Sequence, residues 1–350
     1  MMKKYCVCLL TWLTLLIAVQ CIAQPTLLLP QSSQLAEVKQ RIGYTDVTVV
    51  YHSPAVNGRK VWGALVPYEM IWRAGANENT TITFTDNVTI NGSPLPAGTY
   101  GLHMIPGISS WIVVFSKNHT SWGSYFYNKE EDALRVEVKP ETHEHTEWLE
   151  YTFTDREAAS ANVAMSWEKI RVSFSVGVDV HSIALDKIRL QLRGIAAFGW
   201  HAWEEAAHYC IVNKINYEEA LKWVDRSILV EENHVNLAAK AQLLTLMGRT
   251  KEAAEINRKV LSRMETASET QVNAFGYELM NEHDVPTALD VFRLNVKKHP
   301  DSWNAYDSLA EALNVSGDRK QALANYRIAL SKAPDDQKQR IKGTIATLEQ

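Results

Sequence analysis

The sequence predicts two folds in one chain: an antiparallel, jelly-roll-like β-sandwich followed by an all-α superhelix of repeats, together an α+β multidomain class. Three observations predict this. Between Thr45 and Val180, apolar residues alternate with polar ones, as in strands that bury one face. From His181 onward, apolar residues recur at steps of three and four, which is the period of a helix. Within that second part, helical units repeat at a period of about 34 residues.

Composition limits the functions to consider. A chain of 350 residues is long enough for about two domains, and an apolar share of 46% can supply their cores. The net charge of −4 is small, and the lysines and arginines are scattered rather than grouped. We therefore expect no binding to nucleic acid.

Residues 1–23 have the pattern of a secretory signal peptide. A short basic start precedes the apolar run Val7–Val19, and small residues end at Ala23, where we expect cleavage. This predicts an exported protein of the periplasm or cell envelope, with no transmembrane segment after cleavage. Acylation at Cys21 is the alternative, although the large Gln20 before it disfavours a lipoprotein signal. Cys210 is then the one cysteine of the mature chain and has no partner for an internal disulfide.

The first predicted domain covers residues 24–180 and contains about eight or nine short strands. Asn91-Gly92 marks a tight turn after one of them, because both residues tolerate the left-handed backbone of hairpin turns. Many short strands separated by turns are typical of a sandwich or a jelly roll. The strands are expected at Val47–Tyr51, Ile82–Phe84, Val88–Ile90, Thr99–Ile105, Trp111–Phe115, Leu134–Val138, Glu147–Phe153 and Val172–Val176.

The second predicted domain, residues 181–350, carries the repeats. Ala220, Ala253, Ala288 and Ala322 lie 33, 35 and 34 residues apart, and large apolar and proline positions coincide between the last two units. This is the signature of a tetratricopeptide helix–turn–helix repeat, with units at roughly 201–233, 234–268, 269–302 and 303–336. Such units stack and leave a concave surface, so we expect the array to bind a protein partner. The matched pairs are Val272 and Tyr306, Phe275 and Leu309, Gly276 and Ala310, Leu279 and Leu313, His283 and Gly317, Ala288 and Ala322, Phe292 and Tyr326, Asn295 and Ala329, and Pro300 and Pro334.

Unusual residues are densest between His52 and Glu78, in a turn-rich segment that follows one predicted strand and precedes another. The string Trp-Arg-Ala-Gly-Ala-Asn-Glu that ends at Glu78, with the later string Leu95–Leu102, resembles a bacterial secreted domain known as domain of unknown function 2911. The resemblance covers about Gln31 to Val180, the length of a small domain. It implies a β-sandwich, export and, frequently, an attached repeat region. It implies no established reaction or ligand.

The same segment contains side chains that suit a polar ligand. Arg73 can hold a carboxylate or a phosphate with two hydrogen bonds, and Trp62 and Trp72 offer flat faces for a sugar ring. A structural alternative stays open, in which Arg73 pairs with Glu78 while the tryptophans fill the end of the sandwich. The candidate residues for binding a polar, anionic or glycan-like ligand are His52, Arg59, Trp62, Trp72, Arg73, Asn77, Glu78 and His103.

Metal and cofactor sites are not expected. His143-Glu144-His145 is too compact for a helical zinc motif and fits an exposed hairpin. His201 and His208 share one helical face, which we interpret as the polar face of the first repeat helix.

The sequence favours an exported binding or scaffold protein over an enzyme. It contains no Gly-x-Ser-x-Gly motif, no phosphate-binding Walker loop and no dinucleotide fingerprint. The alternative is a hydrolase or lyase acting on envelope sugars or peptides. In it, His52, Glu78 and His103 would act as acid and base, and Arg73 would hold an anionic substrate.

Overall fold

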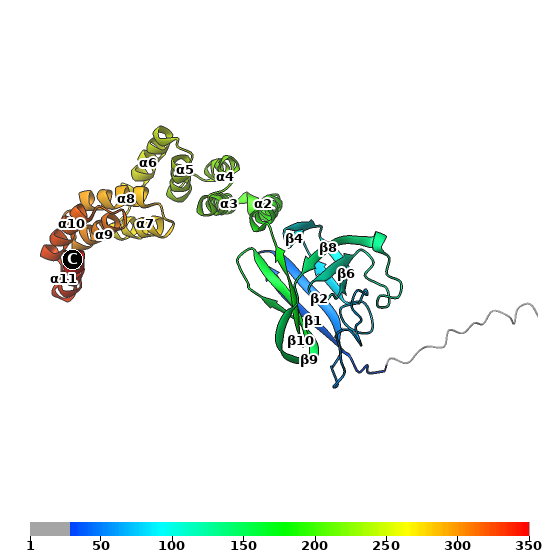
Figure 1. Ribbon diagram of the computed structural model, residues 1–350. Helices are drawn as coiled ribbons and strands as arrows, with labels where there is room; N and C mark the ends of the chain where they lie inside the picture. The colour runs from blue at the N-terminus through cyan, green and yellow to red at the C-terminus, as the bar shows by residue number, and fades with distance from the viewer. Residues whose placement is uncertain (1–28, 350) are drawn as a thin grey trace, which may run out of the picture. The chain divides into compact units, whose positions relative to one another are not determined.

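A computed structural model describes residues 29–349, and the predicted signal peptide lies outside these residues. The chain divides into two compact units, one ending at Ile183 and the other beginning at Ala184 (Figure 1). Among the described residues, no helix is both long enough and apolar enough to cross a membrane.

The first unit contains two open antiparallel sheets. One has six strands in the order β1-β2-β3-β6-β7-β8, and the other has four in the order β5-β4-β10-β9. The strands are β1 (Gln34–Ile42), β2 (Thr45–Ser53), β3 (Thr81–Phe84), β4 (Val88–Ile90), β5 (Ser93–Leu95), β6 (Gly98–Ile105), β7 (Trp111–Ser116), β8 (Asp132–Val138), β9 (Glu141–Thr154) and β10 (Ser160–Gly177), with a short 3₁₀ turn η1 (Lys129–Glu131) before β8.

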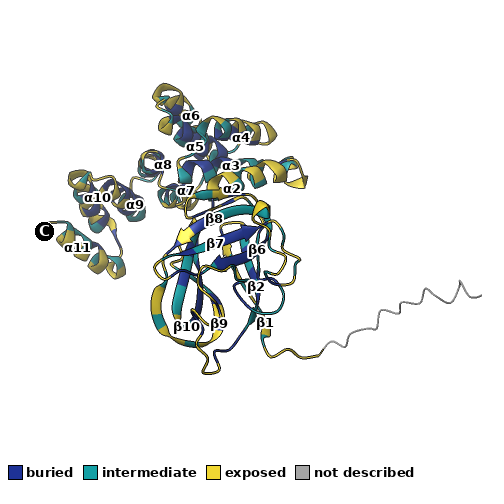
Figure 2. Ribbon diagram, turned by 45° about the vertical axis from the view of Figure 1, so that its right-hand side comes forward, coloured by how far each residue is buried: buried dark blue, intermediate teal, exposed yellow. Residues whose placement is uncertain are grey.

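The two sheets share one hydrophobic core. Val47 and Val49 of β2 are fully buried, and their alternate neighbours are half-buried. Val172 and Phe174 of β10 belong to the same cluster of buried side chains, so the inner faces of both sheets meet (Figure 2). Each buried aliphatic side chain contributes about 1.5–3 kcal/mol. The predicted antiparallel sandwich is confirmed.

Strands β1 and β5 and the first part of β10 are absent from the sequence prediction. β1 lies at an edge of its sheet, where its residues are mostly exposed or half-buried. β10 begins at Ser160, well before the predicted Val172, and its pairing with β9 shifts register twice between Ser166 and Ile170. Glu168, inside that irregularity, has a φ of 57°. A bulge moves the following side chains to the other face, which hides the period of two.

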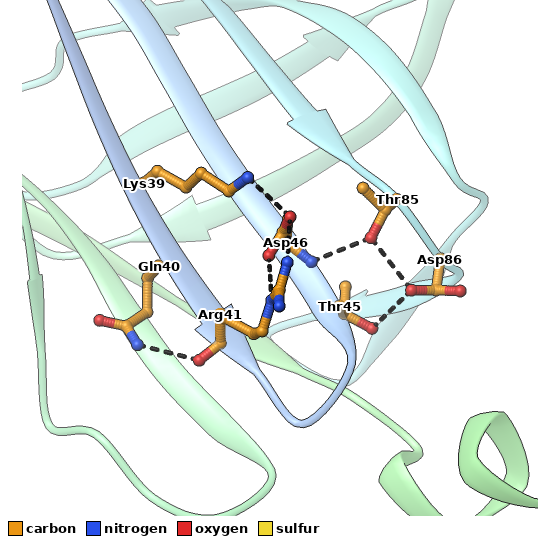
Figure 3. Close-up of polar contacts among 7 residues, drawn as sticks. All are labelled: Lys39, Gln40, Arg41, Thr45, Asp46, Thr85 and Asp86. Atoms are coloured by element: carbon orange, nitrogen blue, oxygen red, sulfur yellow. Dashed lines mark hydrogen bonds and ion pairs between the residues drawn. The ribbon is translucent and has the colours of Figure 1, made fainter. Parts of the chain in front are cut away.

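Polar contacts hold the β1–β2 turn (Figure 3). One carboxylate oxygen of Asp46 lies 2.6 Å from Arg41 Nε, and the other lies 2.6 Å from Lys39 Nζ. The backbone N–H of Asp46 donates to Thr85 Oγ1 at 2.9 Å, which ties the turn to the segment after β3. Gly43 has a φ of +57°, a conformation that glycine adopts without strain.

The second unit is a TPR-like array of ten helices among the described residues, as predicted. Consecutive helices pack as antiparallel pairs, α3 with α4, α5 with α6, α7 with α8, and α9 with α10. The helices are α2 (Val180–Gln191), α3 (Trp200–Asn213), α4 (Tyr217–Val230), α5 (His234–Leu246), α6 (Thr250–Met264), α7 (Glu269–Asn281), α8 (Val285–Lys298), α9 (Trp303–Val315), α10 (Arg319–Lys332) and α11 (Asp335–Glu349), with a 3₁₀ turn η2 (Ile195–Phe198) before α3.

Small residues allow the paired helices to approach closely. A Cβ atom on Gly276 of α7 would lie 2.5 Å from the ring of Phe292 in α8, so a glycine is needed there. At the matched position of the next pair, Ala310 is buried in one cluster with Tyr326 of α10. Cys210 of α3 is fully buried in the cluster formed by the first helices, and this burial raises its pKa to about 11.

Candidate functional site

The segment 54–80, between β2 and β3, is held against both sheets. The N–H of Val56 donates to Glu147 O at 2.8 Å, which ties the start of the segment to β9. Trp72 exchanges two backbone hydrogen bonds of 2.8 Å with Met104 of β6. A loop anchored at both ends in this way can hold side chains in fixed positions.

The family string from Trp72 to Glu78 forms a tight, strained turn. Ala74 is fully buried and has a φ of 51°, which is unfavourable for a residue with a Cβ atom. Its carbonyl accepts hydrogen bonds from Thr80 Oγ1 at 3.2 Å and from the Tyr151 hydroxyl at 2.9 Å, which compensate for the strain. A Cβ atom on Gly75 would lie 3.1 Å from His52 O and still closer to Thr80 Oγ1. The small residues of the string are therefore required by the close approach to β2.

A cavity of about 370 Å³ opens beside this turn, and two arginines line it. Arg73 Nη1 donates to Asn77 O at 2.7 Å, and its guanidinium lies 5.9 Å from the centre of the Tyr125 ring. Arg59 donates to the carbonyls of Val56 and Ala55 at 3.0 and 2.5 Å. Both arginines use backbone oxygens, and in the part of the chain that is described, neither forms an ion pair with a carboxylate. Their positive charges are therefore available to an anion in the cavity.

Indole rings form the apolar part of the cavity wall. Trp72 stacks on Trp167 with ring centres 5.9 Å apart and an angle of 17° between the planes, and Trp148 of β9 completes the wall. Trp62 instead lies in the core, 8% exposed, with its ring centre 4.7 Å from that of Trp111. Of the two predicted tryptophans, Trp72 lines the cavity, and Trp62 packs against Trp72 in the core.

His52 and Glu78 meet at a second hollow, and Asn77 contacts His52. His52 Nε2 lies 2.7 Å from Glu78 Oε2, and both residues line this hollow of about 410 Å³. Asn77 Nδ2 lies 3.1 Å from His52 Nδ1 and donates to Ser33 O at 3.3 Å. Ser33 lines the first cavity, so Asn77 links His52 to a residue of that cavity through this hydrogen bond. The alternative pairing of Arg73 with Glu78 does not occur, because Glu78 contacts His52.

His103 lies apart from these groups. It is 2% exposed on β6, and its Nδ1 lies 3.0 Å from Ser124 Oγ. Burial lowers its pKa to about 4, although the charge of Asp132 opposes the shift. It lines neither the Arg59–Arg73 cavity nor the hollow at His52. The three residues considered for acid–base chemistry, His52, Glu78 and His103, therefore do not share one of these cavities.

The structure adds cavity residues that the sequence did not single out. Trp148 and Trp167 come from β9 and β10, far along the chain from segment 54–80. Their isolated positions in long strands carry no local signal. A hairpin that packs behind the segment brings them there, through the bridge between Ala55 and Trp148.

The helical unit has its own hollow, of about 580 Å³, between the first helices of three successive pairs, α3, α5 and α7. We call it the acidic groove because four glutamates line it: Glu204, Glu205, Glu278 and Glu282. The predicted polar face of α3 opens into this groove, since His201 and His208 also line it. Within the described residues, no three His, Cys, Asp or Glu side chains are grouped so as to hold a metal ion.

The sheets and the helices define the class of this protein: a β-sandwich unit followed by a TPR-like repeat unit. Residues 33–176, which form the sandwich, match the family described as Protein of unknown function (DUF2911). The predicted family is confirmed. No curated protein matches the chain.

Several solved structures are similar to the helical part. A fragment of MamA from Desulfovibrio magneticus RS-1 is 17% identical over 44% of this chain and 84% of that one, with a TM-score of 0.25. YrrB, described as a TPR protein with an unusual peptide-binding site, is 20% identical over 44% of this chain and 78% of that one, with a TM-score of 0.26. A C-terminal part of a TPR repeat-containing protein from Cytophaga hutchinsonii is 13% identical over 44% and 60%, with a TM-score of 0.28. The assignment of the repeats rests on the helix pairs and their period.

Proposed function

We propose that this protein is an exported binding protein of the cell envelope, whose repeat array holds a protein partner in the acidic groove. The groove itself carries the proposal. It is formed by the first helix of each of three consecutive pairs, and in stacked helical repeats such surfaces are extended and concave. Export is supported by the sequence of residues 1–23.

The lining of the groove suits a peptide segment. Trp200, Val212 and Val235 supply apolar surface, and Val212 is 52% exposed. Polar and charged groups lie among them, which is the mixed character of surfaces that bind a protein segment reversibly. A volume of about 580 Å³ accommodates a few side chains of a partner.

Site-specific crosslinking tests this assignment. A photoreactive phenylalanine analogue in place of Val212, in the groove, should give a discrete adduct with a partner in the cells that produce the protein. The control carries the same analogue in place of Leu229 of α4, which is 74% exposed and does not line the groove. Equal adducts from both positions, or none from Val212, would contradict binding in the groove.

The cavity of the β-sandwich supports a second proposal, a small polar ligand with an anionic group. The specific observation is that Arg59 and Arg73 line one cavity and both are held by backbone carbonyls rather than by carboxylates. An anion there would form charge-assisted hydrogen bonds with both guanidinium groups. Trp72 and Trp148 offer faces for the sugar ring of a glycan-like ligand.

Thermal denaturation tests this second proposal. Glucuronate and glucose 1-phosphate should raise the Tm of the wild-type chain, whereas neutral glucose should not. Arg73→Gln should remove the increase, because it removes the charge and most of the donors. Arg156→Gln, an exposed change in the same unit, should keep it. The absence of any increase in the wild type, or an undiminished increase in Arg73→Gln, would contradict the proposal.

A further inference from the structure

The acidic groove contains a carboxylate that lacks a partner inside the protein. Glu204 of α3 is only 6% exposed and lines the groove. Among the described residues, none forms a hydrogen bond or an ion pair with its carboxylate. A buried carboxylate is ordinarily paired, because the loss of water around the charge must be compensated by hydrogen bonds or an opposite charge. A cationic group from outside this chain would supply that compensation.

Acidic groups dominate the described surroundings of Glu204, and His201 alone opposes them. Glu278 and Glu282 reach the same groove from the C-terminal end of α7, where the helix dipole already disfavours a negative charge. Neither of these two carboxylates has a hydrogen bond or an ion pair among the described residues. His201 contacts Glu205 at 3.4 Å, and both are largely exposed. Of the described residues that line the groove, none is a lysine or an arginine.

The remaining histidines do not neutralise this charge. Burial lowers the pKa of His208, which lines the groove. The same cause lowers the pKa of His234, at the start of α5, although the charge of Glu278 opposes that shift. Both imidazoles are therefore mostly neutral at neutral pH. The groove is lined by acidic side chains, and Glu204 is the least exposed of them.

We propose that the acidic groove binds a lysine or arginine side chain of the partner protein, whose cationic end pairs with Glu204 and Glu282. This rests on the proposed function, partner binding in the same groove, and adds the chemistry that selects the partner. The cationic end would supply the opposite charge that the buried carboxylate lacks, and each pair would be a charge-assisted hydrogen bond.

The shape of the site favours a long cationic side chain. Glu204 is only 6% exposed, and lysine and arginine carry their charge at the end of a slender apolar arm that suits such a position. Trp200 and Val235 line the groove beside it and would contact that arm and its apolar neighbours in the partner sequence. The partner segment is therefore basic and apolar together.

The test measures binding of three labelled nine-residue peptides to the full chain by fluorescence anisotropy. The peptides share their alanine and leucine positions and carry lysine, glutamine or glutamate at the remaining positions. The lysine peptide should bind at least about tenfold more tightly than the glutamine peptide, and the glutamate peptide should bind most weakly. Glu204→Gln and Glu282→Gln should each reduce the affinity for the lysine peptide several-fold and leave the affinity for the glutamine peptide unchanged.

A matched control variant and the order of peptide affinities decide the outcome. Glu255→Gln removes one charge from an exposed position on α6, outside the groove, and should leave the lysine peptide bound as in the wild type. Equal loss in Glu255→Gln would show an effect of net charge alone and would overturn the proposal. If the glutamine or glutamate peptide binds as tightly as the lysine peptide, the groove binds peptides without selecting a cation. If the wild type binds none of the three, both the cation preference and peptide binding in the groove are wrong.

Discussion

At the scale of single residues, the burial of Glu204 should lower the free energy of unfolding of the helical unit at neutral pH. Burial and then the charge of Glu282 raise its pKa to about 7, from an ordinary value near 4.5. The folded unit therefore binds more protons than the unfolded chain between about pH 4.5 and 7. The free energy of unfolding must fall as the pH rises through that window. Glu282, whose pKa is also raised to about 7 by burial and by Glu278, adds to the same trend.

Glu204→Gln should reverse part of this loss. Without the ionisable group, the helical unit should be more stable than wild type at pH 8, by about 1–3 kcal/mol, and its stability should depend less on pH between 5 and 8. Urea unfolding followed by far-UV circular dichroism at both pH values measures this. Glu255→Gln, which is exposed, serves as the control. A Glu204→Gln variant that is less stable than wild type at pH 8 would show that Glu204 has an internal partner.

Side-chain types in the sequence indicated part of the β-sandwich cavity. Arg59, Trp72 and Arg73 do line one cavity. The sequence singles them out because all three lie in one short segment. The sequence does not single out Trp148 and Trp167, because their position depends on how β9 and β10 pack against that segment, which no local pattern encodes. His103 was selected for its chemistry, but its burial depends on long-range packing that the sequence does not reveal.

At the scale of elements, the repeat period was the most reliable signal. His283 and Gly317, 34 residues apart, both adopt a positive φ in the turn between paired helices, at 62° and 87°. The aspartate after each of them caps the next helix: Asp284 accepts from Thr287 N and Asp318 from Gln321 N. Local turn chemistry thus repeats with the helices, which is why the period was visible. Strand β1 gives only a weak signal, because Gln40 interrupts its apolar positions and most of its residues stay exposed or half-buried at the sheet edge.

At the scale of the whole molecule, the chain joins two units with separate hydrophobic clusters, one in the sheets and others in the helices. The proposed export of this chain can be tested directly. Mass spectrometry of the protein recovered from a secreting bacterial host should give a mature chain that begins at Gln24. A lipid-modified Cys21 at the N-terminus would instead support the lipoprotein alternative, and an uncleaved chain would contradict export.

The burial of Cys210 has a practical consequence for anyone who wishes to label this protein. In a chain that begins at Gln24 it is the only thiol, and a maleimide reacts with an exposed thiolate, which a fully buried group with a pKa of about 11 does not provide. A single cysteine introduced at Val212, or at an exposed position of the sandwich, would then be the one site that a nitroxide or a dye modifies. With one such cysteine in each unit, dipolar spectroscopy between the two labels measures the distance between the units in solution. Because Cys210 does not react, the distance between two introduced labels can be measured with and without a bound peptide.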